Sequence, residues 1–554
     1  MKKILTSSIL AATMFSLSMN AQAPSWPWAK NAGGPADDRG SSVCADAAGN
    51  SFVTGSYNSS TISFGTHALT NSSSANGLDY YLTKYDPSGT VVWAQTATGI
   101  SNDAGNNVTV DGNGNVYVVG SSNSHSLTFG TTALTGYGYD DVFLVKYDAS
   151  GNVLWAKNAG GSGNDIGSGV SVDGSGNVYI TGYYASPTIS FSGTSLTNLG
   201  SNYNIFVAKY SPSGALLWAK SGGGSSSDQG NGIAVDAKGN AYVTGFFTSS
   251  TCTFNSTSLT NSGGLDMFIV KYDASGNVKW ANNPTGVSNE SGNGICLDPL
   301  GSPHVVGSYN SSVMHFGGSV TTHLVSYDDA FIVKYDTLGV AQWAQTAGGT
   351  QNDIGQSIGV DADGSSYITG YYGSSTMNFG SSSITNLGTN NIFVAKYDPA
   401  GAIVWAKSVG GTGDDEGAAI GVNWHGEAFI TGFYTSASCP IGGNTLTNAG
   451  TQDFFIAKLG TATGIKEETE TPLQISFTPN PSQGVFSLQF KASAGSDYHT
   501  QMTVCDVTGR EIKSPETFNT STFQLDLSSQ PNGIYFVTLV NNGAIQRTKL
   551  IVSR

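Results

Sequence analysis

Charged residues are scarce in this chain, and arginine is almost missing. Only 11% of the 554 residues are Asp, Glu, Lys or Arg, and the formal net charge is −15 at pH 7. The chain has four arginines, of which only Arg39 precedes residue 460. An acidic surface with so little arginine repels phosphate backbones, so we expect no nucleic-acid partner.

Cysteine pairs and zinc motifs are missing as well. The five cysteines form no C-x-x-C pair, and the sequence contains neither H-E-x-x-H nor a Cys/His cluster with zinc spacing. Scattered thiols of this kind favour free cysteines that serve as small apolar residues. The histidines follow no regular spacing, and nothing places a nucleophile, a base and an orienting acid together. We therefore predict no catalytic residues.

Long apolar runs are missing after the start of the chain. Lys2 and Lys3 precede an apolar stretch over residues 4–19 and the small-residue segment Ala21-Gln22-Ala23. This order is typical of an export signal, and we predict that residues 1–21 are the signal peptide. No other run approaches the ~20 residues that a membrane helix needs, so we expect no transmembrane segment.

What the chain has in excess is glycine, 73 residues, and a repeated Trp-Ala pair. Successive tryptophans of these pairs are separated by 65, 62, 63, 62, 63 and 62 residues. A fixed period with short-strand patterns in each unit is typical of a radial repeat architecture. The tryptophans are Trp28, Trp93, Trp155, Trp218, Trp280, Trp343 and Trp405.

Each unit predicts four antiparallel strands, which make one propeller blade. In one unit the strands cover residues 169–173, 178–182, 205–210 and 216–220, with Gly/Asn/Ser/Pro turns between the first and second and between the third and fourth. The third strand is apolar at successive positions, as expected of a strand covered on both faces. The fold class we predict is an all-β, seven-bladed β-propeller.

The two ends of the repeat array complement each other. The Trp28 strand has no earlier strands of its own unit, and the strand at residues 454–459 has no Trp strand after it. We predict that the N-terminal strand completes the last blade and closes the ring over residues 22–460, which removes exposed sheet edges. We also expect a monomer.

The excess length of each unit lies between its second and third strands. A phenylalanine recurs there in six units, which predicts a short extra hairpin on each blade: Phe64, Phe129, Phe191, Phe254, Phe316 and Phe379. These long connections leave the same face of a propeller as the loops that follow each tryptophan. We call this face the long-loop face.

The repeated units resemble the SBBP-type bacterial β-propeller repeat. The resemblance is carried by G-x-x-V-D-x-x-G-N-x-Y-V-T-G, then D-x-F-V-x-K-Y-D-x-x-G, then W-A, over about residues 26–460. It implies a propeller fold and says almost nothing about activity.

Composition changes after residue 460. Residues 461–472 are rich in charge and read as a linker, and residues 473–554 predict six short strands in a small Ig-like β-sandwich. This segment resembles the C-terminal sorting domain of the type IX secretion system. The resemblance implies that the secretion machinery is a partner and that the protein crosses the periplasm to be released or held at the outer-membrane surface. Its motif residues are Pro479, Asn480, Pro481, Gly484, Asp506, Gly509, Gly533, Ile534, Tyr535 and Lys549.

An acid follows each tryptophan by ten residues. One hypothesis is a ring of metal ligands that binds Ca²⁺, which is the one cofactor that the sequence suggests. The other is that each acid accepts backbone N–H bonds and fixes its loop. Presence in every unit favours the second, because sites on repeat scaffolds usually arise where units differ. The acids are Asp38, Asp103, Asp165, Asp228, Glu290, Asp353 and Asp415.

Two functions remain open at this stage. The K-Y-D-x-x-G-x-x-x-W hairpin is similar to a sialidase Asp-box, but the spacing is one residue longer and the arginine cluster of sialidases is missing. We expect a non-catalytic extracellular propeller that binds a glycan or a protein on the long-loop face. The alternative is a hydrolase or lyase that acts on polysaccharide in a pocket on that face.

Overall fold

The structure is a computed structural model that describes residues 24–73, 77–200, 202–317, 319–322, 327–460, 474–491, 500–506, 511–518, 522–541 and 544–554. The chain divides into two compact units, Met1–Thr463 and Gly464–Arg554. The described residues form strands, turns and loops without any helix, so none of them belongs to a helix that could cross a membrane. The predicted signal peptide and the predicted linker lie outside the described residues.

The first unit is built from antiparallel sheets with one recurring strand order, and we call the four strands A, B, C and D. The A strands are β2 (Asp38–Ala45), β8 (Asp103–Val110), β14 (Asp165–Val172), β20 (Asp228–Val235), β26 (Glu290–Leu297), β32 (Asp353–Val360) and β38 (Asp415–Val422). The B strands are β3 (Ser51–Tyr57), β9 (Val116–Ser122), β15 (Val178–Tyr184), β21 (Ala241–Phe247), β27 (Pro303–Tyr309), β33 (Ser366–Tyr372) and β39 (Ala428–Tyr434).

The two outer strands complete each sheet. The C strands are β6 (Asp79–Tyr85), β12 (Asp141–Tyr147), β18 (Asn204–Tyr210), β24 (Asp266–Tyr272), β30 (Asp329–Tyr335), β36 (Asn391–Tyr397) and β42 (Asp453–Leu459). The D strands are β7 (Val91–Thr96), β13 (Val153–Gly160), β19 (Leu216–Gly223), β25 (Val278–Asn282), β31 (Ala341–Ala347), β37 (Ile403–Val409) and β1 (Trp28–Ala32). The predicted strands of residues 169–220 match β14, β15, β18 and β19, with longer A and D strands than expected.

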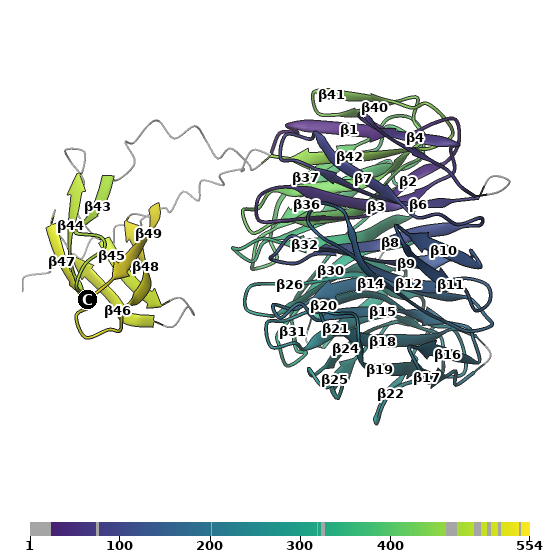
Figure 1. Ribbon diagram of the computed structural model, residues 1–554, viewed down its shortest axis with the longest axis horizontal. Helices are drawn as coiled ribbons and strands as arrows, with labels where there is room; N and C mark the ends of the chain where they lie inside the picture. Colours follow the sequence, from purple (N-terminus) through teal and green to yellow (C-terminus); the bar gives the residue numbers. More distant parts are fainter. Residues whose placement is uncertain are drawn as a thin grey trace, which may run out of the picture. The chain divides into compact units, whose positions relative to one another are not determined.

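The N-terminal strand β1 occupies the D position of the sheet that also contains β38, β39 and β42. Trp28 pairs with Lys458 and Ala32 with Phe454. Figure 1 shows this purple strand beside the green strands of the end of the repeat array. The A strands of successive sheets pack against one another, and β38 packs against β2. The first and last sheets are therefore neighbours.

A hairpin lies between the B and C strands of each sheet, as the sequence predicts. Two of these hairpins extend the preceding sheet rather than their own, since β13 pairs with β16 and β19 with β22. The hairpins are β4–β5 (Thr61–Phe64, His67–Thr70), β10–β11 (Ser126–Phe129, Thr132–Thr135), β16–β17 (Thr188–Phe191, Thr194–Thr197), β22–β23 (Thr251–Phe254, Thr257–Thr260), β28–β29 (Val313–Phe316, Ser319–Thr322), β34–β35 (Thr376–Phe379, Ser382–Thr385) and β40–β41 (Ser438–Ile441, Asn444–Thr447).

The repeated tryptophans link neighbouring sheets. Trp218 donates its indole N–H to the carbonyl oxygen of Ala274, in the C–D turn of the next sheet, at 3.1 Å. Gly276 of that turn has φ +79°, and a Cβ there would stand 2.9 Å from the Trp218 ring. The glycine therefore serves the turn and the contact at once. Trp28 makes the same bond to Pro87, which ties the last sheet to the first.

The C-terminal unit has two antiparallel sheets around one apolar core. One sheet has the order β43–β44–β47 (Gln474–Thr478, Val485–Lys491, Thr522–Asp526). The other has the order β46–β45–β48–β49 (Glu511–Phe518, Thr500–Asp506, Gly533–Asn541, Ala544–Val552). The prediction of six strands was wrong by one, because it omitted β46. This edge strand is polar and contains Pro515, which an edge tolerates and a central strand does not.

Candidate functional site

The seven predicted acids all lie at the first position of an A strand, and their side chains are buried. Asp228 shows how such a carboxylate is held. It accepts hydrogen bonds from the backbone N–H of Gly224 at 2.7 Å, from that of Thr248 at 3.1 Å and from the hydroxyl of Ser249 at 2.7 Å. The carboxylate thus joins the D–A loop to the end of strand B of the same sheet.

The serine partner is a residue that the sequence analysis missed. In every sheet a serine stands 21 residues after the acid, and its hydroxyl donates to that acid. The constant spacing was a visible signal. The serines are Ser59, Ser124, Ser186, Ser249, Ser311, Ser374 and Ser436.

These bonds support the loop-anchoring interpretation of the acids. Among the described residues, no group of three or more His, Cys, Asp or Glu side chains is placed to hold a metal ion. In the A–B turns that are similar to calcium loops, Asp111 accepts bonds from the backbone N–H groups of Asn113 and Asn115, both at 2.9 Å. The Ca²⁺ ring stays a hypothesis that these contacts do not support.

A second set of buried side chains faces these acids from strand C of the preceding sheet. The backbone N–H of Gly161 points to both carboxylates of one pair, Asp141 and Asp165. Burial raises the pKa of each of the two to about 6, and the charge of Asp141 adds to the shift of Asp165. In two sheets this strand-C position is neutral, because Asn204 and Asn391 replace the acid.

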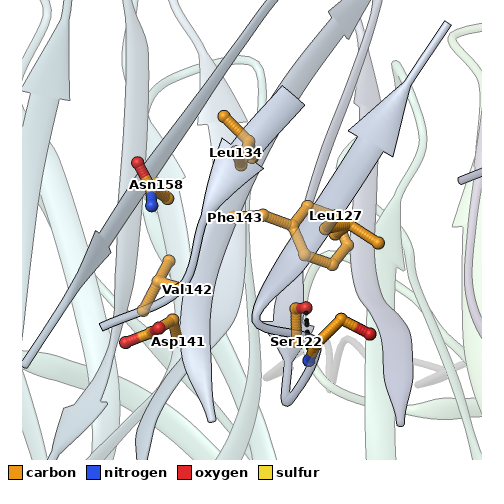
Figure 2. Close-up of a pocket in the computed structure, with 9 residues that line it drawn as sticks. Ser122, Leu127, Leu134, Asp141, Val142, Phe143 and Asn158 are labelled. Atoms are coloured by element: carbon orange, nitrogen blue, oxygen red, sulfur yellow. Dashed lines mark hydrogen bonds between the residues drawn. The ribbon is translucent and has the colours of Figure 1, made fainter. Parts of the chain in front are cut away.

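Figure 2 shows a small cavity beside one of these pairs, in the sheet of β8, β9, β12 and β13. It exists where Ser122 ends strand B, whereas the other six B strands end in Tyr or Phe. Ser122 donates to Asp103, and Asp141, Leu127 and Phe143 also line the space. Its volume of about 10 Å³ suffices for a single water molecule, so it is no site for an organic ligand.

Large apolar side chains gather on the B–C and D–A loops, which form the long-loop face. The units differ here, whereas their strands repeat. On the opposite face, the exposed large apolar residues among those described are Leu300, Leu338, Val340 and Trp424. Those on the long-loop face are Ile100, Tyr137, Tyr139, Leu199, Val287, Tyr327 and Leu387.

A pocket of about 570 Å³ opens on the long-loop face over the sheet of β32, β33, β36 and β37. Its walls are the D–A loop at residues 350–352 and the B–C loop at residues 386–390. Gly373 and Ser375 lie between the two loops. The lining residues are Thr, Gln, Asn, Gly, Ser and Leu, and none of them is charged.

Side chains near the ends of two A strands and two B strands form a cluster that contains charged groups. Arg39 follows the first acid, and its guanidinium lies 5.0 Å from the centre of the Phe433 ring. Glu416 pairs with Phe433 across the sheet. Burial, together with the charge of Asp414, raises the pKa of Glu416 to about 7. Burial and the charge of Glu416 raise the pKa of Tyr371 to about 12.

A Ser-His-Asp arrangement occurs elsewhere, between β27 and β33. His304 Nδ1 lies 2.8 Å from the Ser366 hydroxyl, and its Nε2 lies 3.6 Å from Asp298. All three are buried, and Lys334 forms an ion pair with Asp298 at 2.9 Å. His304 stands where other B strands have Tyr or Phe, so we interpret the group as a packing substitution rather than a catalytic triad.

The structure brings several predicted sorting residues together in the C-terminal unit. The amide of Asn480 donates to the carbonyl oxygen of Lys549 at 2.8 Å and accepts from the N–H of Ile551 at 2.9 Å. Tyr535 pairs with Asp506 and with Leu550 on its two sides. The Pro479–Pro481 segment is thereby tied to the last strand. Gly484 precedes β44, Gly533 and Ile534 begin β48, and Gly509 lies outside the described residues.

Two protein families match parts of the chain. The model of the secretion system C-terminal sorting domain matches residues 476–553. The model of the beta-propeller repeat matches residues 92–127, 154–183 and 222–245. The chain therefore carries β-propeller repeats and a type IX sorting domain, and it is exported, either as a secreted protein or as one attached to the cell surface.

Curated relatives are distant. An uncharacterized WD repeat-containing protein of Acanthamoeba polyphaga mimivirus is 24% identical over 66% of this chain and 32% of its own length. The regulatory protein FlaEY of Caulobacter vibrioides is 25% identical over 69% of this chain and 42% of its own. The chain thus spans less than half of either relative. A solved structure of puromycin hydrolase is 10% identical over 86% of this chain and 64% of its own length. Its TM-score of 0.36 is too low to support a shared fold or function.

Proposed function

We propose that the mature protein is a seven-bladed β-propeller, closed by β1, that binds an extracellular glycan or protein on its long-loop face. The pairing of β1 with β42 and the packing of β38 on β2 support the closed ring. The Ig-like C-terminal sandwich is then the sorting domain that the secretion machinery recognises, and the propeller is the domain that is exported. The propeller acts as a monomer and without catalysis.

The observation that carries this proposal is the contrast between strands and loops. The strands and the acid–serine anchors repeat in every unit, so they supply the fold. The large exposed apolar and aromatic residues on the long-loop face recur in at most two of the seven units: Tyr139 has its counterpart in Tyr327, Leu199 in Leu387 and Ile100 in Val287. Exposed aromatic side chains supply contact area at low entropic cost, and they are enriched at binding surfaces.

The test is binding of the purified protein to arrays of glycans and of extracellular proteins. We expect Tyr139→Ala, on the long-loop face, to weaken a hit, and Leu338→Ala, on the opposite face, to leave it unchanged. Both side chains are largely exposed, so neither change should unfold the protein. Loss of binding only with Leu338→Ala would place the site on the other face and refute the proposal.

A hydrolase or lyase acting on polysaccharide is the second candidate. The cluster of Glu416, Asp414 and Tyr371 favours it, because a carboxyl group with a pKa of about 7 can donate a proton at neutral pH. Incubation with neutral and uronic-acid polysaccharides, followed by analysis of the products, tests it. Glu416→Gln should abolish any cleavage, and intact polysaccharide after incubation with wild-type protein would exclude this candidate for the polymers used.

A further inference from the structure

The pocket over β32 to β37 lies where one unit has a glycine at a position that carries a side chain in the other six. Gly373 directly follows strand B of its sheet. At this position the other units have Asn58, Asn123, Ala185, Thr248, Asn310 and Thr435. Three of those side chains bond to the D–A loop: Thr248 donates to the carbonyl oxygen of Ser227 at 2.8 Å, Thr435 accepts from the N–H of Asp414 at 2.7 Å, and Asn310 accepts from the N–H of Asn289 at 3.0 Å. Gly373 leaves that space open.

The backbone around Gly373 is the same as in the other units. Its N–H donates to the carbonyl oxygen of Asn352 at 2.8 Å, as that of Thr435 does to Asp414 at 2.9 Å. Gly373 is not among the glycines with positive φ. A Cβ built on it would lie 3.0 Å from Oδ1 of Asn390 and 3.4 Å from Cβ of Gln351. A side chain here would therefore point into the pocket, without backbone strain.

The pocket walls are held in place before any ligand arrives. Asn386 donates to the carbonyl oxygen of Tyr372 at 2.9 Å and accepts from the N–H of Gly388 at 2.7 Å. The N–H of Thr389 donates to Gly413 at 3.0 Å, and the Asn390 amide donates to Asp414 at 2.7 Å. Both ends of the B–C loop are thus fixed, which lowers the entropic cost of binding.

The polar groups of the pocket suit hydroxyl groups. Among the described residues, the side-chain amide of Gln351 and the NH₂ group of Asn352 make no hydrogen bond, and both side chains are exposed. An amide offers donors and an acceptor side by side, which matches neighbouring sugar hydroxyls. Leu387, which lines the pocket, is 65% exposed and offers an apolar surface beside these amides.

We infer that this pocket binds a neutral carbohydrate. No lysine or arginine lines it, and the chain carries a net charge of −15, so phosphate and carboxylate ligands are disfavoured. Its volume of about 570 Å³ is that of a small-ligand site rather than of a flat protein interface. The inference rests on the proposed binding function, and it narrows the ligand to neutral sugars and the site to one blade.

The test measures binding of full-length protein to neutral hexasaccharides of glucose, mannose, galactose and xylose by calorimetry, with an oligogalacturonate as the anionic comparison. We expect one neutral series to bind and the anionic one not to bind. Gly373→Thr, which adds the side chain present at Thr248 and Thr435, should weaken binding at least tenfold. Ala185→Thr, which places a threonine side chain at the equivalent position of another sheet, should leave affinity unchanged, and both variants should keep the wild-type melting temperature.

If neutral sugars bind and Gly373→Thr does not weaken them, the assignment of this pocket is overturned. The same holds if Ala185→Thr weakens binding as much as Gly373→Thr does. In both cases the proposed binding function stands. Preference for oligogalacturonate, or no binding to any of the sugars, would overturn the carbohydrate assignment. The array experiment on the long-loop face would then decide separately whether the protein binds a polypeptide there.

Discussion

The buried acid of each A strand is the residue on which the local geometry depends most. The carboxylate bonds to two backbone segments and to one serine hydroxyl. A glycine of the D–A loop donates its N–H to the carboxylate, and because it has no side chain, it leaves room for the serine hydroxyl. A Cβ on Gly224 would stand 2.8 Å from Oγ of Ser249. The bond between acid and serine recurs in each sheet, and this gives the repetition of the acid a structural reason.

Removing the serine of one anchor tests this account. Ser249→Ala deprives buried Asp228 of its 2.7 Å hydroxyl bond, so we expect a loss of about 1–3 kcal/mol in the free energy of unfolding. Ser250→Ala, at the exposed next residue, is the control and should change it by less than about 0.5 kcal/mol. Denaturant titration measures both. Equal stability of the two variants would show that the anchor contributes nothing.

A substitution of the repeated tryptophan tests the contact between neighbouring sheets. Trp218→Ala removes the indole that packs on Gly276 and donates to Ala274. The ring is only half-buried, so we expect about 2–3 kcal/mol, below the ~3–5 kcal/mol typical of a fully buried tryptophan. The neighbouring exposed Leu217, changed to Ala, should cost little. A Trp218→Ala variant as stable as Leu217→Ala would contradict the packing role.

At the scale of elements, the carboxyl pairs between neighbouring sheets predict an unusual pH dependence. Burial raises the pKa of Asp141, Asp165 and Asp353 to about 6 and that of Asp329 to about 7. These groups bind protons more tightly in the folded state than in the unfolded one. Their contribution to stability is therefore complete below about pH 4 and is lost as the pH rises to about 7.

We accordingly expect the melting temperature to fall between pH 5 and pH 7 and to level off above it. Asp329→Asn copies the neutral residue found at Asn204 and Asn391, and it should flatten this decline and raise the melting temperature at pH 8. Asp86→Asn, a change in an exposed turn, is the control. A melting temperature that rises steadily from pH 5 to pH 8 would refute the prediction.

The strand β1 is the element that joins the two ends of the repeat array. Deleting residues 24–34 removes the partner of β42 and leaves its edge open. We expect a clear fall in melting temperature and concentration-dependent association of the variant, measured by calorimetry and light scattering. A monomer that melts at the wild-type temperature would contradict ring closure by β1.

Most elements could be predicted from the sequence because their signals are periodic. The Trp spacing, the strand patterns and the recurring Phe locate the sheets and the hairpins. The pairing of β16 with β13 could not be predicted, since it depends on how neighbouring sheets pack. The strand β46 was missed because its polar sequence lacks alternation, and only its pairing with β45 reveals it.

At the scale of the whole molecule, the candidate site was less predictable than the fold. The sequence indicated the long-loop face, yet the pocket there depends on the absence of a side chain at Gly373 and on loops that meet only in the folded chain. The seven acids predicted as candidate ligands accept hydrogen bonds within their own sheets instead of facing this pocket. The candidate binding pocket lies in a unit that departs from the repeat at Gly373, and the residues that recur in every unit do not line it.

The central claim is that the C-terminal unit directs export and that the propeller is the exported domain. An export assay tests this claim directly. The measurement is the fraction of propeller found outside the outer membrane of a host that carries the type IX system. We expect the full chain to be exported, and a chain that lacks residues 473–554 to stay in the periplasm with its propeller folded. A periplasmic reporter fused to residues 473–554 should leave the cell. Export of the truncated chain at the level of the full one would contradict the account.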